Sequence, residues 1–272
     1  MDEILRNPKE KDIIKAIEFN MYDYFEKFFI KSRDRFYYKK TDSIFLGNSG
    51  IPIGIANLVL RTNIPKDIAI ETIQDIFNYY KEQKLPFVWM TGPLSKPKEI
   101  VELVRKQQKV NIVDYPGMAY NLNFLPETRM KLEDFEIVKA EDKKAYIDFM
   151  NVIEDFIEGE EWKEKIFHFL DNQYALHSSN ETSVFVGYHK GDPVSSSAVH
   201  YSQGVAGLYW IVTKKHARKK GYGTAMTYAP MYEAKNRGYE VIILHASEMG
   251  VHVYSKIGFK EYCNVKWIVW RP

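Results

Sequence analysis

The spacing of apolar residues predicts helices and strands in alternation along the whole chain. Helical intervals predict helices over residues 9–29, 65–80, 97–108, 146–153, 162–174, 225–236 and 250–257. Alternating or continuous apolar runs predict strands over residues 43–47, 51–60, 86–90, 117–123, 135–139, 184–188, 194–201, 205–213, 240–245 and up to Trp270. Antiparallel hairpins followed by strand–helix–strand units indicate an α/β protein with a mixed sheet covered by helices.

Two local patterns sharpen this prediction. Asn48-Ser49-Gly50 separates two apolar runs and predicts a tight hairpin turn between them. Pro230 falls inside the predicted helix 225–236, where an interior proline costs roughly 3 kcal/mol or more. Either this helix is kinked at Pro230 or its limits differ from those of the apolar pattern.

A polar stretch with Pro126, residues 124–131, predicts a domain boundary between residues 1–125 and residues 131–272. The first part closes with a strand, a turn of small residues, a helix and a strand, over residues 86–123, in the same order as the second part. Two degenerate copies of one domain and two unrelated α/β domains both fit this order.

Composition narrows the classes of protein that the chain can belong to. The 272 residues are 45% hydrophobic and 27% charged with a net charge of +2, so charge indicates neither a nucleic-acid nor a membrane partner. The single cysteine, Cys263, excludes an internal disulfide and fits a reducing compartment. The first residues lack a signal-peptide pattern and no apolar run is long enough to span a bilayer, so we expect a cytoplasmic protein.

The strongest chemical signal is the segment Arg218-Lys219-Lys220-Gly221-Tyr222-Gly223-Thr224 between the apolar run 205–213 and the helix that follows. Its glycines let the backbone approach a ligand, and the helix start offers unpaired amides beside three basic side chains. This combination suits a pyrophosphate. The order of residues fits neither a Walker loop nor a dinucleotide fingerprint. A simple glycine turn with solvated lysines is the alternative interpretation.

Together with later segments, this loop resembles the GNAT superfamily of acyl-CoA-dependent N-acyltransferases. The resemblance covers about residue 135 to the end of the chain, and it is carried by Gly207-Leu208-Tyr209-Trp210-Ile211-Val212-Thr213, the glycine loop with Ala225, Leu244-His245-Ala246-Ser247 and Val253-Tyr254-Ser255-Lys256-Ile257-Gly258-Phe259. The first half is similar to the degenerate companion domain of two-domain members, through Trp89-Met90-Thr91-Gly92-Pro93 and Pro116-Gly117-Met118-Ala119. It has no Arg-x-x-Gly-x-Gly, so no cofactor site is expected there.

The resemblance implies a binding site for acetyl-CoA and no metal. The pantetheine arm would pair with the splayed strand at Ile211, Val212 and Thr213. The pyrophosphate would lie on the amides of Arg218, Lys219, Lys220, Gly221, Tyr222, Gly223 and Thr224. Ser247 occupies a position where many relatives contact the cofactor, and Tyr254 matches a tyrosine that protonates the departing thiolate. For Tyr254, packing of a short helix is the alternative.

The general base is harder to assign, because residues 205–213 contain neither Asp nor Glu. His245, His200 and Glu248 are the candidates, and a water chain is another route for the proton. His245 alternates with Ser247 along its strand and histidine titrates in a useful range, although a packed histidine at a strand end fits equally well. Cys263 has no histidine near it in sequence, so a cysteine nucleophile is not expected.

These residues predict an N-acetyltransferase that moves the acetyl group of acetyl-CoA to a primary amine of a small molecule or peptide, by direct attack in a ternary complex. A catalytically silent acyl-CoA-binding regulator and an aminoacyl-tRNA-dependent transferase are the alternatives. Near-neutral charge argues against nucleic acid. Trp162, Tyr209 and the acidic run 158–161 could each contribute to an amine site, against core packing or a solvated loop as the other interpretation. Neither the acceptor nor the oligomeric state can be inferred.

Overall fold

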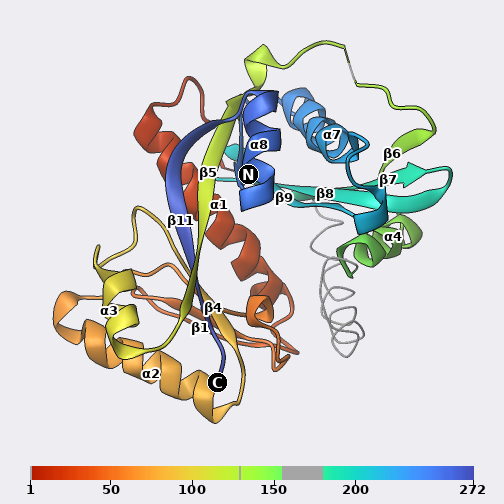
Figure 1. Cartoon of the computed structure of the whole chain (residues 1–272). Helices are drawn as coiled ribbons and strands as arrows, with labels where there is room; N and C mark the ends of the chain where they lie inside the picture. The colour runs from red at the N-terminus through yellow and green to blue at the C-terminus, as the bar shows by residue number, and fades with distance from the viewer. Residues whose placement is uncertain (1, 129, 155–179) are drawn as a thin grey trace. The chain divides into compact units, whose positions relative to one another are not determined.

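The computed structural model describes residues 2–128, 130–154 and 180–272, and it divides into two compact units (Figure 1). Unit 1 comprises Met1–Asn20 and Met118–Tyr262, and unit 2 comprises Met21–Gly117 and Cys263–Pro272. Three elements run from one unit into the other: α1 (Glu10–Lys31), β5 (Asn111–Asn121) and β11 (Lys260–Trp270). The units are therefore not consecutive halves of the chain, and the boundary between residues 125 and 131 stays a prediction.

Unit 1 contains a mixed sheet in the order β5–β10–β9–β8–β7–β6. Its strands are β6 (Phe135–Lys139), β7 (Thr182–His189), β8 (Asp192–Ser202), β9 (Val205–Thr213) and β10 (Val241–His245). Neighbours from β6 to β9 are antiparallel, whereas β9 and β10 are parallel because a helix carries the chain back between them.

Helices lie on both faces of this sheet. Figure 1 shows α7 (Tyr222–Asn236) on one face and α4 (Lys143–Glu154) on the other, while α8 (Glu248–Ile257) follows β10. The apolar core under α7 includes Met226, Met231, Leu208 and Leu244, all nearly inaccessible to solvent. We call it the α7 core.

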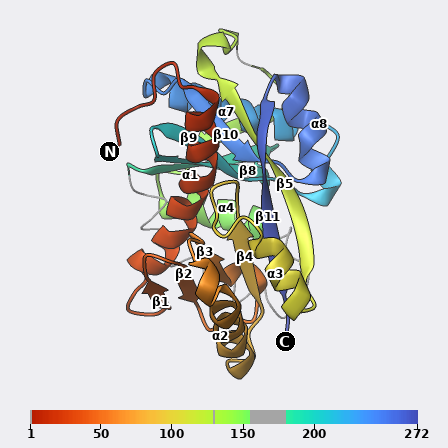
Figure 2. The same ribbon diagram turned by 90° about the vertical axis from the view of Figure 1, so that its left-hand side faces the viewer.

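Unit 2 contains a smaller mixed sheet in the order β1–β2–β3–β4–β11. Its other elements are β1 (Tyr37–Lys40), β2 (Phe45–Asn48), β3 (Asn57–Leu60), α2 (Ala69–Glu82), β4 (Phe87–Thr91) and α3 (Ile100–Gln107). Helices α2 and α3 lie beside this sheet (Figure 2), and their apolar side chains join those of β3 and β4 in one core around Trp89 and Phe77.

The elements predicted within the described residues are present, β1 is an additional strand, and the largest shifts are six residues at the starts of two strands. The second strand of the predicted hairpin begins at Asn57 instead of Ile51, so the connection is a loop and not a tight turn. The buried Asn57 explains this, because its side-chain amide donates to the carbonyls of Ile51 and Ile53 at 2.7 and 3.2 Å and holds the segment as a loop. Strand β5 starts at Asn111, six residues before the predicted start.

Pro230 does not end or delimit α7, which continues from Tyr222 to Asn236. The proline ring is buried in the packing of unit 1, and this packing offsets the lost backbone hydrogen bond. The predicted helix 162–174, Trp162 and the acidic run 158–161 lie outside the described residues. Among the helices that are described, none is long and apolar enough to cross a bilayer.

Candidate active site

Strands β9 and β10 separate in the middle of unit 1 and form a fork. Their parallel register runs from Ala206 opposite Ile242 to Leu208 opposite Leu244. Strand β9 then continues for five residues to Thr213, alongside β8. The fork therefore opens at Tyr209 and His245, the first residues beyond the last parallel pair.

A β-bulge shapes the β9 arm of the fork. Between the pairs Ala198–Tyr209 and Ser196–Val212, β9 has one more residue than β8. Trp210 takes a left-handed φ of +51°, and its carbonyl accepts a hydrogen bond from Ser196 Oγ at 3.0 Å. Because of the extra residue, Leu208 and Ile211 both pack on the α7 core. Tyr209 turns toward α1.

The glycine loop ends at the start of α7. Gly221 has a φ of +84°, in the left-handed region that favours glycine, and it is the N-cap residue of a 15-residue helix. With no side chain at this position, no side-chain oxygen caps the helix start. The first amides of α7 therefore remain available to an anionic ligand, at the positive end of the helix dipole.

Three basic side chains, those of Arg218, Lys219 and Lys220, are exposed on this loop. Arg218 Nε donates to the carbonyl of Thr213 at 3.1 Å, which ties the loop to the end of β9. A Cβ on Gly223 would lie 3.7 Å from Thr213 Oγ1, an ordinary contact. The backbone conformation thus favours glycine at position 221, whereas space does not require it at position 223.

Tyr222 anchors the start of α7 with its side chain. The ring stacks on Phe135 of β6 at a centroid distance of 4.2 Å, and the hydroxyl is 2.8 Å from His189 Nδ1 on β7. The side chain of Tyr222 is therefore occupied by protein contacts, so only its backbone amide is left to bind a cofactor. Thr224, in the first turn of the helix, is half-buried.

The start of α8 lies just after the β10 arm. Ser247 is its exposed N-cap residue, and its Oγ accepts from the Gly250 amide at 3.3 Å. This hydroxyl keeps its own hydrogen as a donor. Glu248, one of the predicted bases, is exposed in the first turn of α8.

Tyr254 is half-buried on α8 and borders the α7 core, as Ile211 does. Its ring meets Phe259 edge-on at 5.9 Å. Burial raises the pKa of Tyr254 to about 12, so the phenol keeps its proton at neutral pH. A proton donor is thus present on the α7 side of the sheet.

His245 turns to the opposite side, toward α1. Its Nε2 is 3.2 Å from the carbonyl oxygen of Ile17, which can only accept a hydrogen. Nε2 therefore carries the hydrogen, and Nδ1 carries the lone pair. Burial lowers the pKa of His245 to about 4, with the bond to Ile17 in partial opposition, so the imidazole is neutral at physiological pH.

His200 is a weaker candidate for the base than His245. Its side chain is fully buried in β8, and Nδ1 is 3.0 Å from Thr182 Oγ1 on β7. Which residue acts as the base stays a prediction. Among the three predicted bases, only His245 stands at the fork.

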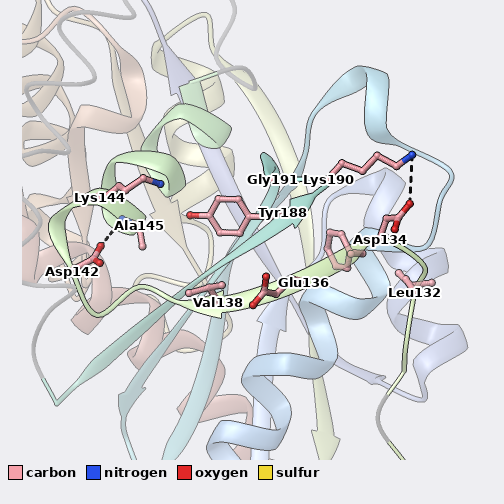
Figure 3. Close-up of a pocket in the computed structure, with 11 residues that line it drawn as sticks. Leu132, Asp134, Glu136, Val138, Asp142, Lys144, Ala145, Tyr188, Lys190 and Gly191 are labelled. Carbon is pink, nitrogen blue, oxygen red and sulfur yellow. Dashed lines mark hydrogen bonds and ion pairs between the residues drawn. The ribbon is translucent and has the colours of Figure 1, made fainter.

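A surface hollow of unit 1 lies at its β6 edge (Figure 3). It has a volume of about 690 Å³ between β6, β7 and α4, and two of its lining residues, Leu132 and Phe135, also lie against Gly221 and Tyr222. Its charged lining consists of three carboxylates and two lysines: Asp134, Glu136, Asp142, Lys144 and Lys190. An excess of negative charge does not suit a pyrophosphate, so we assign the site to the fork and not to this hollow.

The sequence did not identify Asn20 as a residue of the fork, and for Tyr209 it left an amine site and core packing open, with core packing favoured. Asn20 sits in a helix whose polar residues would be expected to face solvent. In the structure, the two side chains are hydrogen-bonded at 2.7 Å. Only the three-dimensional contact between α1 and β9 reveals this pair. In the described part of the chain, no three His, Cys, Asp or Glu residues come together as a metal site would require.

Residues 180–261 match the family model of the acetyltransferase (GNAT) domain. Among curated proteins, none matches the sequence. The match spans β7 to the start of β11 and therefore includes the fork, the glycine loop and both candidate proton-transfer residues.

Solved structures extend the likeness over most of the chain. A GCN5-related N-acetyltransferase from Kribbella flavida has a TM-score of 0.67 at 11% identity, covering 92% of this chain and 95% of its own. One from Sphaerobacter thermophilus has a TM-score of 0.60 at 12% identity, covering 98% and 95%. A tandem GNAT protein from the clavulanic acid biosynthesis pathway has a TM-score of 0.62 at 11% identity, covering 84% and 78%. The predicted fold and the predicted resemblance are confirmed.

Proposed function

We propose that this chain, an acyltransferase whose residues 180–261 form an acetyltransferase (GNAT) domain, transfers the acetyl group of acetyl-CoA to a primary amine. The observation that carries the proposal is the fork between β9 and β10, with the uncapped start of α7 directly after its β9 arm. An extended thiol arm and a pyrophosphate require this pair of features, a strand edge followed by a cluster of amides.

In this proposal the pantetheine arm lies along Ile211, Val212 and Thr213. The pyrophosphate lies on the backbone of residues 218–224, where the left-handed φ of Gly221 supports a close approach. Arg218, Lys219 and Lys220 add positive charge at the rim. The Ser247 hydroxyl, at the start of α8, is placed to donate to the cofactor.

Acetyl-CoA supplies the activated thioester carbonyl, and the chain supplies orientation and proton transfer. The neutral His245 accepts a proton from the attacking amine at Nδ1, the nitrogen that carries its lone pair. Tyr254 holds its proton at neutral pH and donates it to the departing sulfur. A backbone amide of the β9 arm stabilises the developing negative charge on the carbonyl oxygen. The base and the acid belong to opposite faces of the sheet, which supports in-line attack across the fork.

The acceptor in this proposal is a primary amine of a small molecule or peptide, and the protein acts in the cytoplasm without a nucleic-acid or membrane partner. Near-neutral net charge and the single cysteine support this assignment. The reaction as proposed requires no metal.

Calorimetric titration with acetyl-CoA, beside NADH as a second pyrophosphate compound, tests the cofactor assignment. Micromolar binding of acetyl-CoA alone is the expected result. Thiol release with ethanolamine, benzylamine, histamine, spermidine and glucosamine then tests the reaction. Absence of acetyl-CoA binding would refute the site. Binding without thiol release from any amine would leave a cofactor-binding regulator as the better description.

A further inference from the structure

We propose that Ser196 of β8 is a positioning residue of this site: its hydroxyl holds the Trp210 carbonyl and thereby directs the Ile211 amide at the thioester oxygen. This inference rests on the proposed function, because it names the β9 amide that meets the developing negative charge and the side chain that orients it. Ser196 belongs to none of the segments through which the cofactor would be held. In the sequence it is the middle residue of a run of three serines, Ser195 to Ser197.

The bulge of β9 contains a backbone conformation that a bulky residue rarely adopts. Trp210 has a φ of +51°, in the left-handed region where a large side chain is an outlier. Such a conformation persists only where neighbouring groups hold it. Ser196 is fully buried, and its Oγ donates to the Trp210 carbonyl at 3.0 Å. The hydroxyl therefore holds the peptide group that joins Trp210 to Ile211.

The two polar ends of this peptide group point in opposite directions. The bond is trans, and in a planar trans peptide the carbonyl and the N–H are antiparallel. Because the Trp210 carbonyl is turned to Ser196 on β8, the Ile211 N–H is turned away from β8. The neighbour of β9 on that side is β10, and its pairing with β9 has ended three residues earlier, at Leu208. The Ile211 amide is thus directed to the open side of the fork.

The place of Ile211 along β9 matches the reacting end of the cofactor. In the proposed site the pyrophosphate lies on residues 218–224, beyond Thr213, so the pantetheine arm runs inward from Thr213 and ends near Ile211. Ile211 is the innermost of the three proposed cofactor-binding residues of β9, two residues from Tyr209, where the fork opens. The thioester carbonyl therefore meets the Ile211 amide, and a preorganised amide stabilises the oxygen as negative charge develops on it.

Ser195 and Ser197 provide matched controls on the same strand. All three serines are fully buried, but the Oγ atoms of Ser195 and Ser197 have no hydrogen-bond partner within the described part of the chain. Replacement of either by alanine removes the same atom from β8 without removing a hydrogen bond. A general effect of a smaller residue in β8 therefore appears in all three alanine variants, whereas an effect on the peptide group appears only in Ser196→Ala.

Binding of acetyl-CoA labelled with ¹³C at the thioester carbonyl, followed by NMR, tests the role without an amine. A hydrogen bond to this oxygen draws electron density from the carbonyl carbon and moves its signal downfield. We expect a downfield shift on binding to the wild-type protein, an equal shift in the two control variants and a smaller shift in Ser196→Ala. The calorimetric Kd should change less than about twofold, because a group that acts on developing charge contributes little to ground-state binding.

Turnover of the best panel amine gives a second readout. Ser196→Ala should lower kcat by about three- to tenfold, the effect of one neutral hydrogen bond. Ser196→Thr keeps a hydroxyl at the same position and should restore part of both the kcat and the carbonyl shift. Ser195→Ala and Ser197→Ala should retain the wild-type kcat. If Ser196→Ala does not fold, Ser196→Cys replaces it, because a thiol is a weaker donor of similar shape.

Four results would overturn the inference while the proposed function stands. They are a wild-type protein that binds acetyl-CoA without a downfield shift, a full shift in Ser196→Ala, an equal loss in the control variants, and a loss of acetyl-CoA affinity as large as the loss of kcat. If no amine is turned over, the carbonyl shift and the Kd decide. Failure of the wild-type protein to bind acetyl-CoA would instead refute the proposed function itself.

Discussion

Each unit contains a strand–helix–strand crossover between parallel neighbours, β9–α7–β10 in unit 1 and β3–α2–β4 in unit 2, and the two crossovers differ where their parallel strands end. In unit 1, β9 extends five residues beyond its last pair with β10 and carries a bulge. In unit 2, the β3–α2–β4 crossover pairs Leu58 with Val88 and Val59 with Trp89, and β3 ends one residue later at Leu60. The same connectivity therefore produces an open fork in one unit and a short, closed pair in the other.

The segment after β3 closes the place where a fork would open. The Lys96 amide donates to the Thr62 carbonyl at 2.9 Å, and the Ile64 amide donates to the Lys96 carbonyl at 3.0 Å. The buried Trp89 adds a bond from Nε1 to Thr62 Oγ1 at 2.7 Å. These bonds occupy the backbone edge that in unit 1 is proposed to receive the pantetheine arm.

The segments that lead from β3 into α2 and from β9 into α7 also differ. Residues 61–68 contain no glycine, and α2 begins behind a short 3₁₀ turn, Lys66–Ile68. Arg61 has a left-handed φ of +57°, but its guanidinium binds the carboxylates of Asp23, at 2.6 Å, and Glu26. Basic charge near this crossover is thus neutralised by unit 2 itself. A site of this kind needs the extended strand, the bulge and the uncapped glycine start, and not only the crossover.

Gly221→Asp should disrupt the glycine start of α7, which most clearly distinguishes the crossover of unit 1 from that of unit 2. The substitution places a side chain at a φ of +84° and a negative charge where the pyrophosphate is proposed to lie. We expect the Kd for acetyl-CoA to rise by about 100-fold or more, from backbone strain and charge repulsion. Calorimetric titration measures the change.

Gly50→Asp is the control for the strain alone. Gly50 also has a positive φ, +73°, but it lies in a loop of unit 2 with open space around it. The same substitution there should leave acetyl-CoA affinity within about twofold, since surface changes away from a site have small effects. Equal losses in both variants would show that Gly221 acts through stability and not through the ligand.

Tyr254→Phe should affect turnover and spare binding. Removing a general acid typically lowers the rate by about 100-fold or more, and we expect about 10- to 100-fold here because a thiolate is a good leaving group. The Kd for acetyl-CoA should stay within about twofold. Tyr239→Phe, a tyrosine of the same apolar core, is the control and should retain full turnover. If kcat is unchanged in Tyr254→Phe, the tyrosine only packs α8 against Phe259.

The parts of the site that sequence predicts are those with short-range causes. Strand β9 has the predicted limits, 205–213, because an apolar run is bounded by Gly204 and Lys214. The left-handed turn at Gly221 follows from residues next to one another in the chain, although α7 begins at Tyr222, three residues before the predicted start. The argument about Pro230 was also local, and it could not include the burial of the proline, which is a property of the tertiary structure.

The parts that sequence does not predict depend on long-range contacts. The bulge at Trp210 is defined by the register with β8, and no glycine marks it. The tautomer of His245 depends on a carbonyl 228 residues away, and the orientation of Tyr209 depends on an amide 189 residues away. The buried Asn57 that converts the predicted hairpin into a loop is likewise recognised only by its contacts.

His245 should make unit 1 sensitive to acid. Its pKa in the folded chain, about 4, lies below that of an unfolded histidine, about 6.5, so the unfolded state binds the proton first as the pH falls. The contribution of His245 to the free energy of unfolding is fully present above about pH 6.5 and is lost between about pH 6.5 and pH 4. The free energy of unfolding should therefore fall by about 2 kcal/mol on going from pH 7 to pH 5. Urea unfolding at the two pH values measures it. His245→Gln should remove that part of the loss, whereas the exposed His252→Gln should not.

Thr62→Val tests the closed crossover and has the smallest expected effect on the site. The substitution keeps the shape of the side chain but leaves the buried Trp89 Nε1 without its acceptor, which costs about 1–3 kcal/mol of unfolding free energy. Thr72→Val on the half-buried side of α2 should cost less. Acetyl-CoA affinity should be unchanged in both, because the proposed cofactor site belongs wholly to unit 1. A loss of affinity in Thr62→Val would mean that the closed crossover of unit 2 contributes to binding, and the contrast between an open and a closed fork would no longer explain where the ligand is held.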